Sequence, residues 1–168
     1  MATRRKVFVS YHHGGDRNAY ETFVRLYQNK HEVVHDNSPD RPIGSEDPDY
    51  VIRRLREDFL RGASTTIVLC GRNTPGRKYV DWEILASLNQ DMGLVGIYLP
   101  TARREDDKVI IPSRLYDNTQ SGYALFRSWD TLQNSPDSLS DWIEESLTRD
   151  KSLIRNGHDK RLANAPLV

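Results

Sequence analysis

One carboxylate of this chain follows a buried strand at a position suited to chemistry. Thr65 to Cys70 is an apolar, β-branched run, which is typical of a strand buried on both faces. Gly, Asn and Pro residues then break the strand, and Val80, Ile84 and Leu88 recur at steps of four, which predicts a helix. Glu83 therefore lies in the first turns of this helix, just past the carboxyl end of the strand, where open parallel sheets bind ligands.

The predicted position of Glu83 also suggests its charge state. A helix N-terminus favours a negative charge, so we expect an ionised carboxylate that could stabilise a developing positive charge or act as a nucleophile. The alternative is a purely electrostatic role at the helix start. Tyr79 lies four residues earlier on the same helical face. Trp82 adjoins Glu83 and either walls a pocket or packs under the sheet.

A second group of candidates lies where the first predicted strand, Lys6 to Tyr11, ends. Ser10 and Tyr11 straddle the strand end, so one of them must face the crevice beside the sheet. His12 and His13 follow, and either could hydrogen-bond a ligand. No Cys or acidic residue lies at ligand spacing from them, so we expect no metal site.

Groups that could hold a phosphate are also present, although each has an ordinary explanation. Arg72 and Arg77 follow the third strand and could bind pyrophosphate, or they could be solvated loop residues. Gly14 and Gly15 could let the backbone approach a phosphate at the next helix, but a turn would use them equally well. No Ser/His/Asp or Cys/His constellation is evident.

Strands and helices alternate along the whole chain. Strands are predicted at 6–11, 32–35, 64–70, 94–99 and 123–129, and helices at 16–30 with Asp16 as N-cap, 47–62, 78–91 and from 135 onward. Residues 101–121 are interpreted as a long loop, with at most one helical turn. This pattern predicts an α/β, flavodoxin-like three-layer sandwich with a five-stranded parallel sheet of order 2-1-3-4-5. The crevice would lie between strands one and three.

Length and composition limit the classes of protein and partner. The 168 residues fit one domain, 1–150, followed by a basic tail or loosely docked extension, 151–168. Lys plus Arg equals Asp plus Glu at 24 each, so we expect no nucleic-acid partner. The only cysteine, Cys70, lies in a predicted core strand, which favours a reducing compartment without disulfides. No apolar run reaches the roughly 20 residues that span a bilayer, so we expect a cytoplasmic protein.

Two segments resemble a known family. The run Val7 to His12 and the run Thr74 to Ile84, with Trp82-Glu83-Ile84 at a helix start, are similar to the TIR-like family of bacterial proteins. The similarity is greatest to the small stand-alone TIR proteins of the Thoeris anti-phage defence system. It extends over roughly residues 5 to 150 as a pattern of elements. The resemblance implies a flavodoxin-like fold and, as in many members, cleavage of NAD+.

The resemblance also assigns roles to individual residues. The catalytic glutamate of the family corresponds to Glu83, and Tyr79 stands where the family usually has Trp. The loop from Ser10 to Asp16 corresponds to the part of the pocket that meets the nucleotide. The segment Asp36 to Glu46 corresponds to a mobile loop that also makes head-to-tail contacts in TIR domains. The implied substrate contacts are Ser10, Tyr11, His12, His13, Asp36, Asn37, Arg72, Tyr79 and Trp82.

The implied activity is NAD+ nucleosidase or ADP-ribosyl cyclase chemistry without a metal or resident cofactor, since NAD+ is the substrate. We expect an ADP-ribose-derived, cyclic signalling nucleotide that acts on a downstream effector, and a phage protein is a candidate trigger. Self-assembly would use the segment Asp36 to Glu46. Two alternatives stay open: a non-catalytic TIR scaffold that acts by self-association, and a nucleoside deoxyribosyltransferase-like enzyme.

Overall fold

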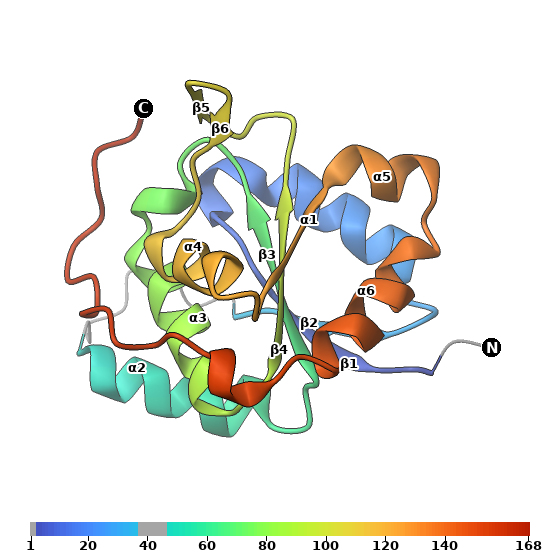
Figure 1. Ribbon diagram of the computed structural model, residues 1–168, viewed down its shortest axis with the longest axis horizontal. Coiled ribbons are helices and arrows are strands. Elements are labelled where there is room, and N and C mark those ends of the chain that lie inside the picture. Colours follow the sequence, from blue (N-terminus) through green and yellow to red (C-terminus); the bar gives the residue numbers. More distant parts are fainter. Residues whose placement is uncertain (1–2, 37–46) are drawn as a thin grey trace.

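The computed structural model describes residues 3–36 and 47–168 of the chain. Five parallel strands form a central sheet of order β2-β1-β3-β4-β7 (Figure 1). The strands are β1 Lys6–Ser10, β2 Glu32–Val34, β3 Thr65–Cys70, β4 Gly93–Tyr98 and β7 Leu125–Ser128. Because β7 is the fifth strand of this sheet along the chain, the predicted α/β fold and its 2-1-3-4-5 order are confirmed.

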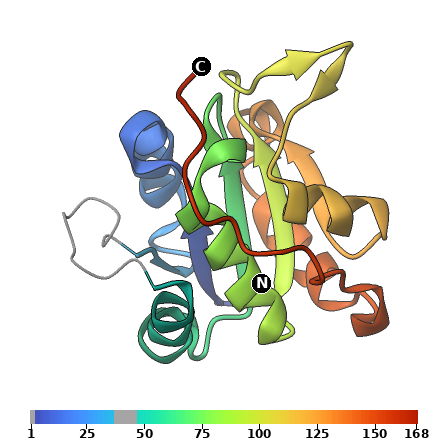
Figure 2. The same cartoon turned by 90° about the vertical axis from the view of Figure 1, so that its left-hand side faces the viewer.

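Helices cover both faces of the sheet and make it the middle of three layers (Figure 2). One face carries α1 His13–Tyr27, α5 Trp129–Asn134 and α6 Ser138–Leu147, whose apolar side chains share one core cluster. The other face carries α2 Pro48–Arg54 with its π-helical continuation η2 Leu55–Leu60, α3 Lys78–Asn89 and α4 Ser113–Gln120. Short 3-10 turns are η3 Thr74–Gly76 and η4 Lys151–Leu153.

The alternation of side chains along β1 determines what the residues at its end can reach. Val7 and Val9 pack against the α1 face, whereas Phe8 packs with α2 and α3. Since successive side chains of a strand point to opposite faces, Ser10 shares the side of Phe8 and Tyr11 the side of Val9. The predicted division of these two residues between the faces is thus settled: Ser10 is on the α3 side.

The start of α1 differs from the prediction. The helix begins at His13, and Asp16 lies inside it at a kink, with φ −120° and ψ 20°. Asp16 is therefore not the N-cap. Its carboxyl group instead accepts a hydrogen bond from Thr74 in the loop after β3, a partner that local sequence cannot reveal.

The stretch 101–121 is more regular than a long loop. It contains an antiparallel hairpin, β5 Arg104–Glu105 with β6 Lys108–Val109, and then the two-turn helix α4. The helix buries Leu115 in the core against α3. A helix this short has too few apolar residues for its period to be visible in the sequence. The predicted last helix, from residue 135 onward, corresponds to α6, whereas α5 lies before residue 135, where no helix was predicted.

The C-terminal residues 151–168 run across the outer side of α3 toward the loop after β3 (Figure 2). Along this path the segment exchanges hydrogen bonds with α4, α3 and η3, for example between Ala165 N and Gly76 O at 2.9 Å. In the described part of the chain, no helix combines the length and apolarity that a bilayer crossing needs.

Candidate functional site

The side chain of Glu83 is held at the carboxyl end of β1. Ser10 Oγ donates a hydrogen bond to Glu83 Oε1 at 2.7 Å, and the glutamate is only 1% exposed. Glu83 Oε2 is buried and has no hydrogen-bond partner within residues 3–36 and 47–168. One oxygen of the carboxyl group is thus fixed by the protein, while the other has unused hydrogen-bonding capacity.

Burial governs the charge state of this carboxyl group. Desolvation raises the pKa of Glu83 well above its usual value, Asp36 raises it further, and Ser10 and Arg54 only partly oppose the rise. Burial therefore opposes the ionised form of Glu83 that the helix dipole favours. Glu83 lies in the second turn of α3, where the dipole has weakened and desolvation is the larger effect.

An ion pair accompanies Glu83 on the same side of the sheet. Arg54 Nη2, at the end of α2, lies 2.6 Å from Asp36 Oδ2, just beyond β2. The Asp36 side chain is fully buried, and Arg54 is 17% exposed. We call Ser10, Asp36, Arg54 and Glu83 the carboxyl cluster. Asn37 and the rest of the predicted loop, residues 37–46, lie outside the described residues.

Four rings stack on the opposite side of the β1 end. Tyr11 is sandwiched between His13 and Tyr20, with ring centroids 4.2 and 4.6 Å away. The hydroxyl group of Tyr20 hydrogen-bonds His35 Nδ1 at 2.7 Å, just after β2. We call Tyr11, His13, Tyr20 and His35 the aromatic cluster. The sequence prediction found the first two and missed the others, although His35 directly follows a strand that neighbours β1.

The ring of His12 explains the Gly14-Gly15 pair. A Cβ atom added at Gly14 or Gly15 would lie 3.1 or 3.0 Å from a nitrogen of this ring, so a larger residue would require the ring to shift slightly. Burial, followed by the charge of Arg77, lowers the pKa of His12. The two glycines therefore make space for an imidazole in this structure.

Asp16 connects the two loops that border the predicted crevice. Thr74 Oγ1 lies within 3.3 Å of Asp16 Oδ2, and a Cβ atom on Gly71 would be 2.3 Å from the same oxygen. Asp16 is 6% exposed, and burial raises its pKa to about 6. From sequence, this titratable group at the β1–β3 switch point was interpreted as a helix cap and, through the family resemblance, as the end of the loop that meets the nucleotide.

Tyr79, Trp82 and Arg72 have described contacts away from the carboxyl cluster. Trp82 is fully buried with α2 and α3, and its Nε1 donates to Arg161 O at 2.8 Å. The ring centroids of Tyr79 and Trp82 lie 5.1 Å apart, with the two rings tilted against each other. Arg72 Nε donates to Val168 O at 2.8 Å. Of the two readings left open for Trp82, the contacts support core packing.

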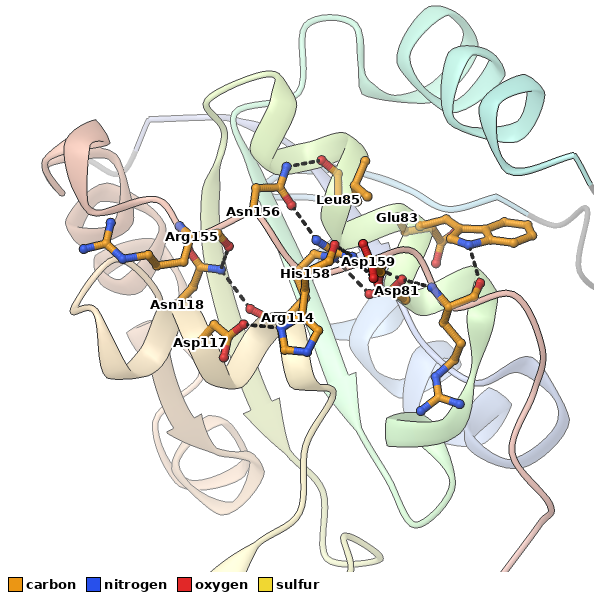
Figure 3. A network of polar contacts seen from close by, with 12 residues as sticks. Asp81, Glu83, Leu85, Arg114, Asp117, Asn118, Arg155, Asn156, His158 and Asp159 are labelled. Atoms are coloured by element: carbon orange, nitrogen blue, oxygen red, sulfur yellow. Dashed lines mark hydrogen bonds and ion pairs between the residues drawn. The ribbon is translucent and has the colours of Figure 1, made fainter.

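A polar network ties the C-terminal segment to α3 and α4 (Figure 3). Arg114, with a fully buried side chain, pairs with Asp81 at 2.9 Å and donates to Asn156 Oδ1 and His158 O, both at 2.9 Å. Asn118 exchanges two hydrogen bonds with the backbone of Arg155. This network holds the segment in one place without an apolar core of its own.

The same segment supports the beginning of the helix that carries Glu83. Asn164 Oδ1 accepts a hydrogen bond from Lys78 N, the first amide of α3, at 2.9 Å. Helix N-termini leave such amides unsatisfied, and Arg77, at the N-cap position, supplies no side-chain acceptor. Asn164 therefore takes over a capping role from 86 residues further along the chain. Nothing in its local sequence indicates this role.

A metal site would need several ligating side chains close together. Across 3–36 and 47–168, no group of three or more His, Cys, Asp or Glu side chains has a geometry that could hold a metal ion.

The sheet order and the buried glutamate after β3 together define a protein of the TIR-like α/β class. The family described as "Thoeris protein ThsB, TIR-like domain" matches residues 8–104, more than half of the chain. The chain thus belongs to the ThsB TIR-like family.

Among solved structures, the chain is similar to the TIR domains of the activated Roq1 resistosome, which directly recognizes the pathogen effector XopQ. The sequence identity is 13% and the TM-score 0.41, over 85% of this chain and 81% of that one. No curated protein matches the sequence.

Proposed function

We propose that the protein is an NAD+-consuming TIR enzyme that breaks the bond between nicotinamide and ribose and produces an ADP-ribose-derived signalling nucleotide. The observation that carries the proposal is the Ser10–Glu83 pair, in which a carboxyl group is fixed through one oxygen at the switch point of the sheet. Its membership of the ThsB TIR-like family supports a role in anti-phage defence. The reaction would take place in the cytoplasm, without a metal or a resident cofactor.

The chemistry needs a negative charge near the ribose. Nicotinamide leaves as a neutral ring from a cation, so acid catalysis is of little use, and the ribosyl group develops positive charge in the transition state. Burial raises the pKa of Glu83 and favours its protonated form, but a cationic substrate next to it favours the ionised form. Oε2, which has no partner among the described residues, could accept a hydrogen bond from a ribose hydroxyl group once the residues that cover Glu83 move.

Planar rings would hold the flat ends of the substrate. The aromatic cluster presents phenol and imidazole faces at the end of β1, and Tyr79 adds another ring one turn before Glu83. Stacking on such faces orients nicotinamide or adenine. Exclusion of water around the reacting ribose favours cyclisation over hydrolysis, so we propose a cyclic product that would act on a downstream effector.

The burial of Glu83 suggests how activity is controlled. At 1% exposure, the carboxyl group cannot meet a ribose unless covering residues move. We infer that the conformation in which Glu83 is buried is a resting form and that a trigger, such as a phage protein, opens it. Self-association through the segment Asp36 to Glu46 is the proposed route to the active state.

The test is mass spectrometry of NAD+ incubated with the protein, in pure form and in lysates of phage-infected cells. Wild type should release nicotinamide with an ADP-ribose-type product, and Glu83→Gln should lose at least about two orders of magnitude of rate. Glu21→Gln, an exposed carboxylate on α1, is the matched control and should retain activity. Absence of an NAD+-derived product in both settings would exclude the enzyme. Cleavage of deoxynucleosides alone would favour the transferase alternative.

A second candidate function is a non-catalytic scaffold. Complete burial and a hydrogen bond to Ser10 are also what a structural carboxyl group shows, so the same geometry is compatible with assembly alone. Normal defence signalling by folded Glu83→Gln would support the scaffold and contradict catalysis.

A further inference from the structure

Three guanidinium groups line one small pocket away from the carboxyl cluster. The pocket has a volume of about 130 Å³ and lies between the loop after β3, the exit of β4 and the C-terminal segment. Arg72 comes from the first of these, Arg103 from the second and Arg161 from the third. Segments that are distant in sequence thus converge to place three positive charges around a cavity.

The positive charge of this pocket is only partly neutralised by acidic side chains. None of the described residues that line it is Asp or Glu. Arg72 and Arg161 donate to backbone oxygens, those of Val168 and Ala163. The closest described carboxylate to any of the three guanidinium groups is that of Glu105, 3.8 Å from Arg103 Nε. That Nε atom is buried and has no hydrogen-bond partner in the described part of the chain.

Backbone contacts hold together the segments that carry these arginines. The amide of Arg161 donates to Asp81 Oδ2 at 2.8 Å, and its carbonyl oxygen accepts from Trp82 at 2.8 Å. Further along, a Cβ atom on Gly76 would lie 2.7 Å from the Cβ of Ala165, so glycine permits the close approach of the two segments. The anchor points are therefore in place before any ligand arrives, which lowers the entropy cost of binding.

We propose that this arginine pocket, formed by Arg72, Arg103 and Arg161, binds the oxyanion of a phosphate group. Guanidinium groups present planar pairs of N–H donors that match phosphate oxygens and hold them by charge-assisted hydrogen bonds. The volume admits a phosphate group but not a whole nucleotide, which would have to extend into solvent. The source is free phosphate, a diphosphate or the phosphate end of a nucleotide, and the site does not depend on NAD+ cleavage.

Isothermal titration calorimetry at low ionic strength tests the proposal, with inorganic phosphate, pyrophosphate and ADP-ribose as separate ligands. We expect saturable binding of at least one, weakened at least about tenfold by Arg103→Gln and by Arg161→Gln. Lys108→Gln, on the β5–β6 hairpin, should bind as wild type does. Thermal denaturation shows that each variant is folded.

The ligand series separates the sources. Binding of phosphate or pyrophosphate supports a site for free anions, and binding of ADP-ribose alone supports a nucleotide phosphate. Absence of saturable binding by all three would overturn the proposal and would indicate that contacts such as Arg72–Val168 already satisfy the pocket. Binding that both arginine variants retain would overturn it as well. Neither result would affect NAD+ cleavage, which Glu83→Gln tests by itself.

Discussion

Ser10 Oγ and Glu83 Oε1 are joined by a 2.7 Å hydrogen bond although 73 positions separate the two residues. The bond links the end of β1 to the helix that follows β3, directly across the point where the winding of the sheet reverses. It also leaves the second oxygen of a buried carboxyl group without a partner among the residues described. A buried oxygen without a hydrogen bond lowers the stability of a folded protein. Because functional sites are where proteins keep such unfavourable groups, this oxygen marks the Ser10–Glu83 pair as a candidate functional site.

The substitution Ser10→Ala tests how much the hydrogen bond from Ser10 to Glu83 contributes to the free energy of unfolding. Without the hydroxyl donor, neither oxygen of the carboxyl group has a described partner, and we expect a loss of about 1–3 kcal/mol in the free energy of unfolding. Urea denaturation at neutral pH measures the change. Ser152→Ala, at an exposed position, should have almost no effect. Equal stability of Ser10→Ala and wild type would mean that the hydrogen bond contributes little.

The raised pKa of Asp16 predicts that the stability of the protein depends on pH in a specific way. Its pKa in the folded protein is about 6, against 3.8 for the free side chain, so folding favours the protonated form. This contribution is complete below about pH 4 and is lost as the pH rises through about 6. Asp16→Asn imitates the neutral form and can still accept from Thr74. We therefore expect it to be more stable than wild type by about 1–3 kcal/mol near pH 7.5, and similar to wild type near pH 3.5.

Urea denaturation between these two pH values, with Asp130→Asn at an exposed site as the control, measures the effect. The control should follow the wild-type curve throughout. A constant difference between Asp16→Asn and wild type at every pH would show that titration of Asp16 is not the cause.

The sheet could be predicted because each of its strands carries a local signal. Thr65 to Cys70 is apolar on both faces and is followed by breakers and a helical period, and the same alternation recurs along the chain. The division of Ser10 and Tyr11 between opposite sides follows from the period of a strand alone. Glu83 was found for the same reason, since its place after a core strand is a sequence property.

Contacts between distant polar residues could not be predicted. Asp16 looked like an N-cap, but its partner is Thr74 in another loop, and the charge state of Glu83 depends on burial that only the packed structure creates. The C-terminal segment carries no apolar period that would predict its position. Polar groups such as Asn164 and Asn156 hold it against the rest of the protein instead. Patterns of hydrophobicity do not report such contacts.

Arg114→Met tests whether the C-terminal segment depends on the buried ion pair. Arg114 is fully buried, so its removal leaves Asp81 without its charged partner and three backbone or amide acceptors without a donor. We expect a loss of about 3–5 kcal/mol in stability. We also expect faster trypsin cleavage after residues of the segment such as Arg155 and Lys160, visible by mass spectrometry under native conditions.

Arg127→Met is the matched control, because the pair of Arg127 with Glu145 is largely exposed and such pairs are worth at most about 1 kcal/mol. Its proteolysis pattern should equal that of wild type. If Arg114→Met is destabilised but the C-terminal segment stays protected, other contacts must hold the segment.

Gly76→Ala tests the close approach of the C-terminal segment to the turn before α3. The added methyl group would lie 2.7 Å from the Cβ of Ala165, a distance that real structures do not tolerate, so one of the two segments must move. We expect displacement of the segment around Ala165 and faster hydrogen exchange at the amides of Ala165 and Lys78, which lose their acceptors. Gly157→Ala, where an added Cβ meets nothing within 4 Å, is the control and should leave exchange unchanged.

The double substitution Gly76→Ala/Ala165→Gly removes the clashing methyl group and should restore protection, because the predicted conflict is between these two positions alone. Failure of this rescue would show that the alanine disturbs the η3 turn itself and not its contact with the C-terminal segment.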